Sequence, residues 1–152
     1  MAMITKLVLP VAGEGRRMRP LTFKTPKALI GLCGKPLLDY LLEEAAASGV
    51  RDVILIINPC HKSDFRKYIE LRRKLFPRLR FFVRVQEKPA GNGHAILQAA
   101  DIIGNSPFAV RFCDDLIKGN TPALASLIRF YEMYRAPVLL LERVPWRRVS
   151  RY

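Results

Sequence analysis

Apolar and polar positions alternate along the chain in two patterns, one typical of strands and one typical of helices. Five short segments are rich in apolar residues, most clearly at 53–57, where an unbroken run indicates a strand buried on both faces of a sheet. Between these segments, apolar residues recur at spacings of three and four, which predicts helices with one buried face. The expected strands are 7–11, 52–58, 81–85, 108–112 and 138–142, and the expected helices are 36–49, 63–77, 92–103 and 121–131.

This alternation predicts an α/β fold, with an open, doubly wound, mostly parallel sheet of the Rossmann-like type that stops after its fifth strand. Ligands of such sheets bind beyond the carboxyl ends of the strands, so functional residues should collect in the loops 12–27, 58–61, 86–94 and 113–118. Pro10 lies inside the first strand and has no N–H for the ladder, so we expect that strand to end or bend there.

The first of these loops combines glycines with basic residues. Gly13 and Gly15 let the backbone lie close to a ligand, because neither carries a Cβ. Cationic side chains that suit phosphate oxygens follow, namely Arg16, Arg17, Arg19, Lys24 and Lys27. The spacing matches neither the complete dinucleotide fingerprint nor a Walker loop. The loop therefore indicates a phosphate site, with a merely solvated basic loop as the alternative.

The third loop, Q-E-K-P-A-G-N-G-H-A, joins an amide side chain to glycines at the start of a helix. Gln86 can donate and accept hydrogen bonds at once, as reading the edge of a uracil or thymine requires, and Gly91 would let the main chain approach the base. The alternative is that Gln86 is simply a polar strand end. His94 is interpreted as a residue that supports the start of the helix.

The fourth loop places carboxylates directly after a strand, at Asp114 and Asp115. Carboxylate oxygens are hard ligands that suit Mg²⁺, so this strand end is a candidate metal site. A turn or helix-capping aspartate is the alternative.

Length and composition fit one domain that can bury a core. The chain has 152 residues, half of them hydrophobic, and no apolar run long enough to span a membrane. Its three cysteines lack the paired spacing of a zinc site or disulfide framework, and the amino terminus lacks a signal-peptide core. We therefore expect a soluble cytoplasmic protein without a membrane partner.

The net charge of the chain predicts an acidic partner. The 26 Lys+Arg residues outnumber 13 Asp+Glu residues, which leaves a formal net charge of +13. The basic residues are spread over the first loop, the helix 63–77 and the carboxyl end without a recognisable nucleic-acid motif, which argues against nucleic acid. A nucleotide is also an acidic partner. The basic face of helix 63–77 is interpreted as solvated, with an anionic partner as the alternative.

Three segments resemble motifs of the sugar nucleotidyltransferase family. The first loop matches G-x-G-x-R-[ML]-x-P-x-T-x-x-x-P-K at Gly13, Gly15, Arg17, Met18, Pro20, Thr22, Pro26 and Lys27. Gln86 and Gly91 fall in a segment similar to the family's Q-x-x-x-x-G-x-G-H-A, and Asp114 follows a strand as in x-D-[DV]. Within the family, the sequence most resembles the uridylyltransferases that act on glucose 1-phosphate. Arg16, Cys113 and a short 61–79 connection depart from the usual pattern.

The resemblance implies attack of a sugar 1-phosphate on UTP, giving UDP-sugar and pyrophosphate, with Mg²⁺ as cofactor. It implies Arg17 and Lys27 as catalytic residues and Asp114 as a metal ligand. It also implies nucleotide binding by Ala12, Gly13, Gly15, Gln86 and Gly91. A thymidylyl- or guanylyltransferase for a sugar 1-phosphate, and a non-catalytic nucleotide- or RNA-binding module, are the alternatives.

The resembled family also carries a sugar-binding segment and a second metal-binding aspartate, and nothing after Arg143 matches either. We therefore expect residues 1–152 to be the nucleotide-binding half of the domain, without the sugar-binding half, and to bind nucleotide with little turnover. The apolar segment 138–141 would then lack sheet neighbours and favour association into a homo-oligomer.

Overall fold

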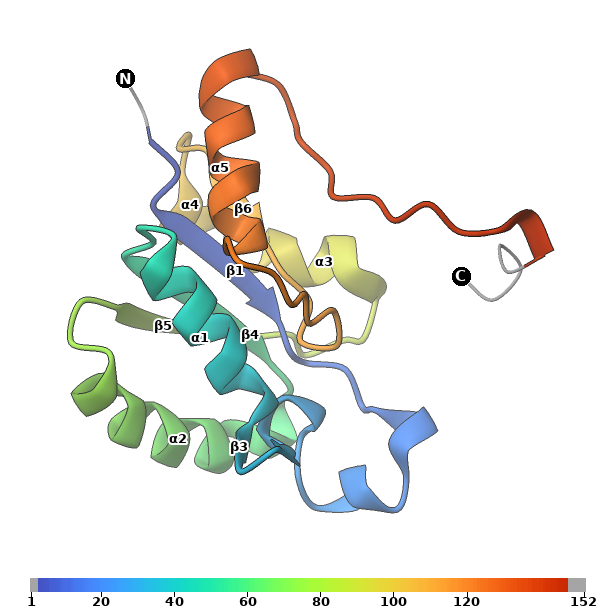
Figure 1. Cartoon of the computed structure of the whole chain (residues 1–152). Coiled ribbons are helices and arrows are strands. Elements are labelled where there is room, and N and C mark those ends of the chain that lie inside the picture. Colours follow the sequence, from blue (N-terminus) through green and yellow to red (C-terminus); the bar gives the residue numbers. More distant parts are fainter. Residues whose placement is uncertain (1–2, 148–152) are drawn as a thin grey trace.

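A parallel sheet with helices on both faces forms the body of the protein (Figure 1), as seen in a computed structural model that describes residues 3–147. The strands lie in the order β5-β4-β1-β6, and every neighbouring pair is parallel. Their bounds are β1 Lys6–Pro10, β4 Asp52–Ile57, β5 Arg80–Val85 and β6 Phe108–Val110. The predicted open, doubly wound α/β fold is confirmed.

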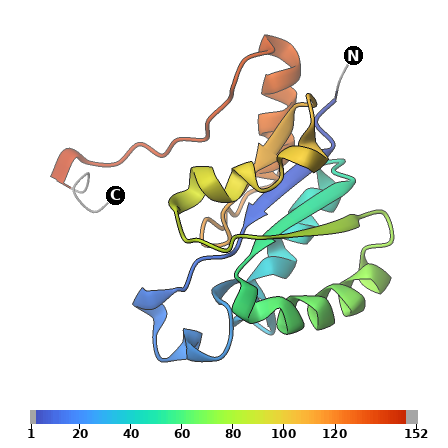
Figure 2. The same cartoon turned by 180° about the vertical axis from the view of Figure 1, so that it is seen from behind.

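The helices divide between the two faces of this sheet. Helices α1 (Leu37–Ala47), α2 (Lys62–Leu75) and α5 (Ala123–Tyr134) cover one face. Helices α3 (Gly91–Leu97) and α4 (Ala100–Ile103) cover the other, which Figure 2 shows from behind. No helix within residues 3–147 is long and apolar enough to cross a membrane.

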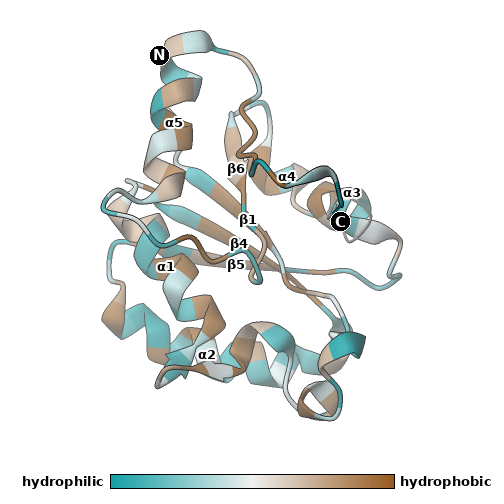
Figure 3. Cartoon of the chain, turned by 45° about the vertical axis from the view of Figure 1, so that its right-hand side comes forward, coloured by the Kyte–Doolittle hydropathy of each residue, from teal (hydrophilic) through white to brown (hydrophobic). Residues whose placement is uncertain are grey.

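The register of the central strands explains their unbroken apolar runs. Leu7 pairs with Val53, and Val8 pairs with Ile54. The side chains of Leu7 and Val53 pack with α1, α2 and α5, whereas Val8 and Ile54 pack with Ala95 and the rest of the α3–α4 layer. Because successive side chains enter opposite layers, all of β4 and the middle three residues of β1 are buried. Figure 3 shows the hydrophobic colour along these strands.

Two predicted boundaries gain a physical explanation. Strand β1 ends at Pro10, as predicted, and the N–H of Val11 donates to the carbonyl of Ile56 at 2.9 Å. The predicted helix 92–103 is instead two helices, because the amides of Gln98 and Ala99 donate to carbonyls three residues back, which tightens the chain there.

Short elements fill the connection from β1 to α1, and the sequence did not indicate them. A hairpin of β2 (Gly31–Leu32) and β3 (Lys35–Pro36) turns at Cys33 and Gly34, whose φ angles of 49° and 87° suit a primed two-residue turn. The connection also contains the 3₁₀ turns η1 Arg16–Met18, η2 Leu21–Phe23 and η3 Lys27–Leu29, and a further turn, η4 Pro59–His61, follows β4.

The predicted fifth strand is wrong, because residues 138–142 form no strand. They run as an extended segment away from the body (Figure 1), with Leu139 79% and Leu141 82% exposed. Strand β6 also ends at Val110, two residues earlier than expected. A fifth strand beside β6 would gain only a short ladder on one side, too little to offset the entropy of ordering it.

Candidate active site

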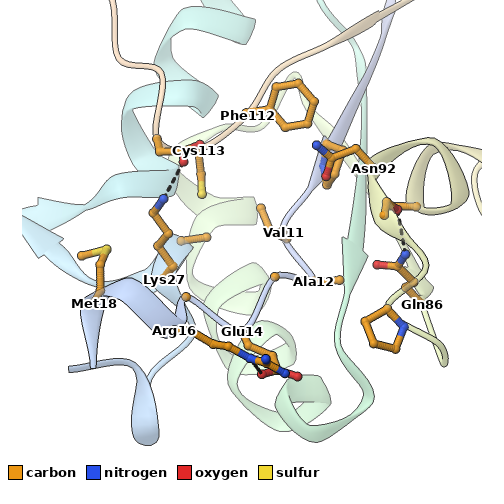
Figure 4. Close-up of a pocket in the computed structure, with 18 of the residues that line it drawn as sticks. Val11, Ala12, Glu14, Arg16, Met18, Lys27, Gln86, Asn92, Phe112 and Cys113 are labelled. Carbon is orange, nitrogen blue, oxygen red and sulfur yellow. Dashed lines mark hydrogen bonds and ion pairs between the residues drawn. The ribbon is translucent and has the colours of Figure 1, made fainter. Parts of the chain in front are cut away.

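A pocket of about 690 Å³ opens at the carboxyl ends of β1, β5 and β6 (Figure 4). Three of the four predicted loops line this pocket, and the loop 58–61 does not. The pocket is lined by every residue to which the family resemblance assigns a role, namely Ala12, Gly13, Gly15, Arg17, Lys27, Gln86, Gly91 and Asp114. Two of the predicted phosphate-suited cations, Arg19 and Lys24, do not line it. The pocket therefore lies where an open parallel sheet binds its ligands.

The loop after β1 depends on glycine at position 15. Gly15 has φ 60°, and a Cβ there would lie 2.7 Å from Cγ2 of Thr22. The hydroxyl of buried Thr22 donates to the Gly15 carbonyl at 2.9 Å, so these two residues fix the return of the loop. A Cβ on Gly13, by contrast, would meet no atom within 4 Å. Gly15 thus shapes the loop, while Gly13 keeps backbone open to the pocket.

The arginines of this loop differ in their partners. Arg16 Nε donates to Glu14 Oε2 at 2.7 Å, and Arg19 Nη2 lies 3.6 Å from the same oxygen. The hydrogen bond from Arg16 lowers the pKa of the Glu14 carboxyl. Arg17 makes no ion pair with any residue in 3–147 and lines the pocket. Arg17 is therefore the loop arginine available to an anionic ligand.

Lys27 and Asp114 meet across the pocket. Lys27 Nζ donates to Asp114 Oδ2 at 2.6 Å, which links the start of η3 to the loop after β6. The hydrogen bond from Lys27 lowers the pKa of Asp114 despite partial burial, which acts in the opposite direction. Next to this pair, burial raises the pKa of the Cys113 thiol, and the charge of Asp114 adds to the shift.

Gln86 occupies the opposite wall of the pocket, directly after β5. It is only 7% exposed, and its backbone N–H continues the ladder to Ile57 O at 2.9 Å. The side-chain Nε2 donates to the Gly91 carbonyl at 3.0 Å and lies 3.1 Å from His94 Nδ1. Gly91 has φ 88°, a backbone conformation that favours glycine.

Arg111 supports the loop that carries Asp114 and Asp115, and the sequence pattern did not single it out. Its Nη2 donates to the Asp115 carbonyl at 2.9 Å and to Glu44 Oε2 at 3.0 Å. Glu44 also accepts the N–H of Leu124 at the start of α5, at 2.9 Å. The signal was an arginine inside an otherwise apolar predicted strand, since a buried guanidinium needs a carboxylate partner.

The pocket offers a metal ion few protein ligands. Within residues 3–147, no group of three or more His, Cys, Asp or Glu side chains could hold a metal. Asp114 does face the pocket, with its side chain 49% exposed. One or two carboxylates together with substrate phosphates are a usual ligand set for Mg²⁺, so the site fits an ion that arrives with a nucleotide.

Comparison with known proteins identifies the family of the chain. Residues 6–152 match the model of the family described as nucleotidyl transferase. The chain belongs to the nucleotidyl transferase family. The predicted resemblance is therefore confirmed at the level of the family.

Proteins named as UTP–glucose-1-phosphate uridylyltransferases are similar to this chain along its length. The UTP–glucose-1-phosphate uridylyltransferase YngB of Bacillus subtilis is 34% identical over 98% of this chain and 56% of its own length. The UTP–glucose-1-phosphate uridylyltransferase of Mycoplasma pneumoniae is 33% identical over all of this chain and 58% of its own length.

Solved structures of UDP-glucose pyrophosphorylases have folds similar to that of this chain. A UDP-glucose pyrophosphorylase complexed with UDP-glucose has a TM-score of 0.86 at 31% identity, covering 99% of this chain and 61% of that one. A UTP-bound enzyme from Acinetobacter baumannii has a TM-score of 0.75 at 28% identity, covering 88% of this chain and 54% of that one. The chain thus spans less than two thirds of the length of these relatives.

Proposed function

We propose that the chain binds UTP as the nucleotide-binding half of a uridylyltransferase that uses a sugar 1-phosphate, with glucose 1-phosphate as the expected acceptor. One observation carries the proposal: a buried amide, Gln86, faces the same pocket as Arg17, Lys27 and Asp114. This pocket can therefore hold a base at one wall and phosphates at the other. The similar relatives named as UTP–glucose-1-phosphate uridylyltransferases support the choice of nucleotide and sugar.

Each side chain has a role that its position supports. The open backbone at Ala12 and Gly13, and the loop fixed by Gly15, would contact the nucleotide and its phosphates. Arg17 would stabilise the charge that develops on the leaving pyrophosphate, and Lys27 would contact the reacting phosphates. Gln86 and the backbone at Gly91 would contact the base.

Asp114 would hold Mg²⁺ when the nucleotide brings it, and the ion would neutralise charge on the phosphates. Asp114 is paired with Lys27 in the structure, so Lys27 would turn from the carboxylate to a phosphate when nucleotide binds. The ion pair thus holds both side chains in place until the ligand arrives.

The reaction needs no covalent intermediate on the protein. An oxygen of the sugar 1-phosphate attacks the α-phosphorus of UTP and forms a new P–O bond. The bond from that phosphorus to the bridging oxygen breaks, and its electron pair leaves with pyrophosphate. The protein's contribution would be alignment and charge stabilisation by Arg17 and Lys27. We propose a cytoplasmic location, where the free cysteines would stay reduced.

Isothermal titration calorimetry tests the proposed preference for UTP. We expect UTP with Mg²⁺ to bind more tightly than ATP or GTP, and a uridine RNA oligomer to bind weakly at physiological salt. Gln86→Leu should remove most of the preference for UTP. Equal affinity for all nucleotides would refute base reading by Gln86, and tighter binding of RNA with a steep salt dependence would favour a nucleic-acid module instead.

A pyrophosphate-release assay with UTP, glucose 1-phosphate and Mg²⁺ tests the proposed division of the domain. Residues that align the sugar phosphate contribute ~7 kcal/mol or more to such reactions. If residues 1–152 are the nucleotide-binding half alone, UTP should bind with little or no sustained turnover. Turnover at ordinary enzyme rates would show that this chain supplies the sugar site as well.

A further inference from the structure

The amide of Gln86 is held on its nitrogen side by two neighbours. Nε2 donates to the Gly91 carbonyl at 3.0 Å and lies 3.1 Å from His94 Nδ1. A carbonyl can only accept, so the amide atom that faces Gly91 must be the nitrogen. The two contacts use both amide hydrogens. Gln86 is therefore left with only its oxygen for a ligand, and Figure 4 shows that oxygen directed toward Ala12, away from the Gly91 contact.

This arrangement sets a condition on His94. A neutral imidazole has one N–H and one acceptor nitrogen, so Nδ1 must carry the lone pair and Nε2 the hydrogen. If Nδ1 carried the hydrogen, two donors would face each other. Turning the Gln86 amide over would relieve that clash only by placing its oxygen against the Gly91 carbonyl. The correct orientation of Gln86 therefore depends on the acceptor at His94.

Gln98 competes for the same imidazole from the other side. Its Nε2 lies 3.3 Å from His94 Nε2 and also donates to the His94 carbonyl at 3.1 Å. A neutral ring can accept from Gln86 or from Gln98, not from both. Gln86 makes the shorter contact and is more deeply buried, so leaving its hydrogen unpaired would cost more. The geometry favours the tautomer that serves Gln86.

We propose that His94 is a positioning residue for base selection, which holds the Gln86 oxygen toward the base. The inference rests on the proposed uridine-nucleotide function. An acceptor alone favours a base whose ring nitrogen carries a hydrogen, such as N3 of uracil or thymine. It disfavours cytosine, whose N3 carries a lone pair. His94 itself does not line the pocket, so it acts through Gln86.

The ratio of the UTP and CTP dissociation constants measures this selection, because the two nucleotides share their sugar and phosphates. Calorimetry with Mg²⁺ should show that the unmodified chain prefers UTP by about tenfold or more. His94→Leu removes the acceptor and should bring the ratio to within about threefold of one. His94→Asn can place an amide oxygen near the position of Nδ1 and should keep most of the preference. Gln98→Leu removes the competitor and should keep or raise it.

Several outcomes would overturn the proposal. One is an unchanged ratio in His94→Leu, and another is an equal loss in Gln98→Leu, which would indicate a general disturbance of α3. Should His94→Leu not fold, as judged by its circular dichroism, the comparison of His94→Asn with His94→Gln replaces it. The Asn variant should keep the preference, and the Gln variant, whose amide reaches the Nε2 position instead, should lose it. Equal affinity of the unmodified chain for UTP and CTP would refute the proposed base reading itself.

Discussion

Lys27 Nζ and Asp114 Oδ2 lie 2.6 Å apart, although the two residues are 87 positions apart in the sequence. The contact joins the basic loop after β1 to the carboxylate loop after β6. It also gives Lys27 an anionic partner in the pocket, a role that the nucleotide phosphates would take over on binding.

Removing Lys27 should raise the pKa of Asp114 toward its ordinary value. The hydrogen bond from Lys27 is the largest cause of the lowered pKa, so Lys27→Met leaves mainly burial, which raises it. A ¹³C NMR titration of the Asp114 carboxyl measures the change directly. Lys24→Met removes one positive charge from the same loop and should leave the Asp114 titration nearly unchanged.

The lowered pKa of Asp114 also makes the stability of the fold depend on pH. Because the pKa of Asp114 is lower in the folded chain than in the unfolded one, its stabilising effect is present above the unfolded value, near pH 4, and is lost as the pH falls through the folded value. The Asp114 side chain is 49% exposed, so solvent screening keeps this contribution well under ~1 kcal/mol. Urea unfolding of Lys27→Met should therefore depend slightly less on pH in that window than unfolding of Lys24→Met.

Arg17→Ala should impair function without impairing the fold. The side chain lines the pocket, lies in an exposed loop and makes no ion pair within residues 3–147. UTP binding should weaken, and any pyrophosphate release should fall by about 100-fold or more. Arg16→Ala is the matched control, since Glu14 already engages Arg16, and its effect should be much smaller. Equal effects of the two substitutions would remove the special role of Arg17.

Arg111→Met should destabilise the chain strongly. The Arg111 and Glu44 side chains are only 7% and 13% exposed, so the substitution leaves a buried carboxylate without its cation. We expect a loss of about 3 kcal/mol or more in the free energy of unfolding, measured in urea. Arg84→Met breaks a solvent-exposed pair with Asp101 and should cost less than ~1 kcal/mol. A small loss for Arg111→Met would mean that the buried pair does not organise the carboxylate loop.

The extended segment 138–142 should promote self-association. Leu139 and Leu141 are exposed on a chain with strand-like composition, and such a segment can pair with the edge of another copy. Replacing both leucines with lysine should lower the apparent mass in light scattering at high protein concentration. Leu71→Lys with Leu75→Lys, on the exposed face of α2, is the matched control. Monomeric behaviour of the unmodified chain at every concentration would contradict the prediction of a homo-oligomer.

The central strands could be predicted because a strand that is buried on both faces of a sheet consists of consecutive apolar residues, as at Val53 and Ile54. The loops of the candidate site were predictable for a similar reason. Glycines, cations and carboxylates gathered at strand ends, and in a parallel sheet those ends share one edge. The functional roles of these residues stay predictions.

Other features depend on tertiary contacts that local patterns do not contain. The segment 138–142 has the composition of a strand, but a strand also needs a neighbour, and none pairs with it in residues 3–147. The pairing of Arg111 with Glu44 spans 67 positions, so no short motif encodes it. The acceptor role of His94 appears only when Gln86 and Gln98 are seen on either side of its ring.

A crystal structure of the chain with UTP and Mg²⁺ tests the central claim most directly. We expect the uracil ring beside Gln86 and Gly91, the phosphates along the loop from Gly13 to Arg17, and Lys27 turned from Asp114 to a phosphate oxygen. UTP bound on the basic face of α2, or with its base away from Gln86, would contradict the account.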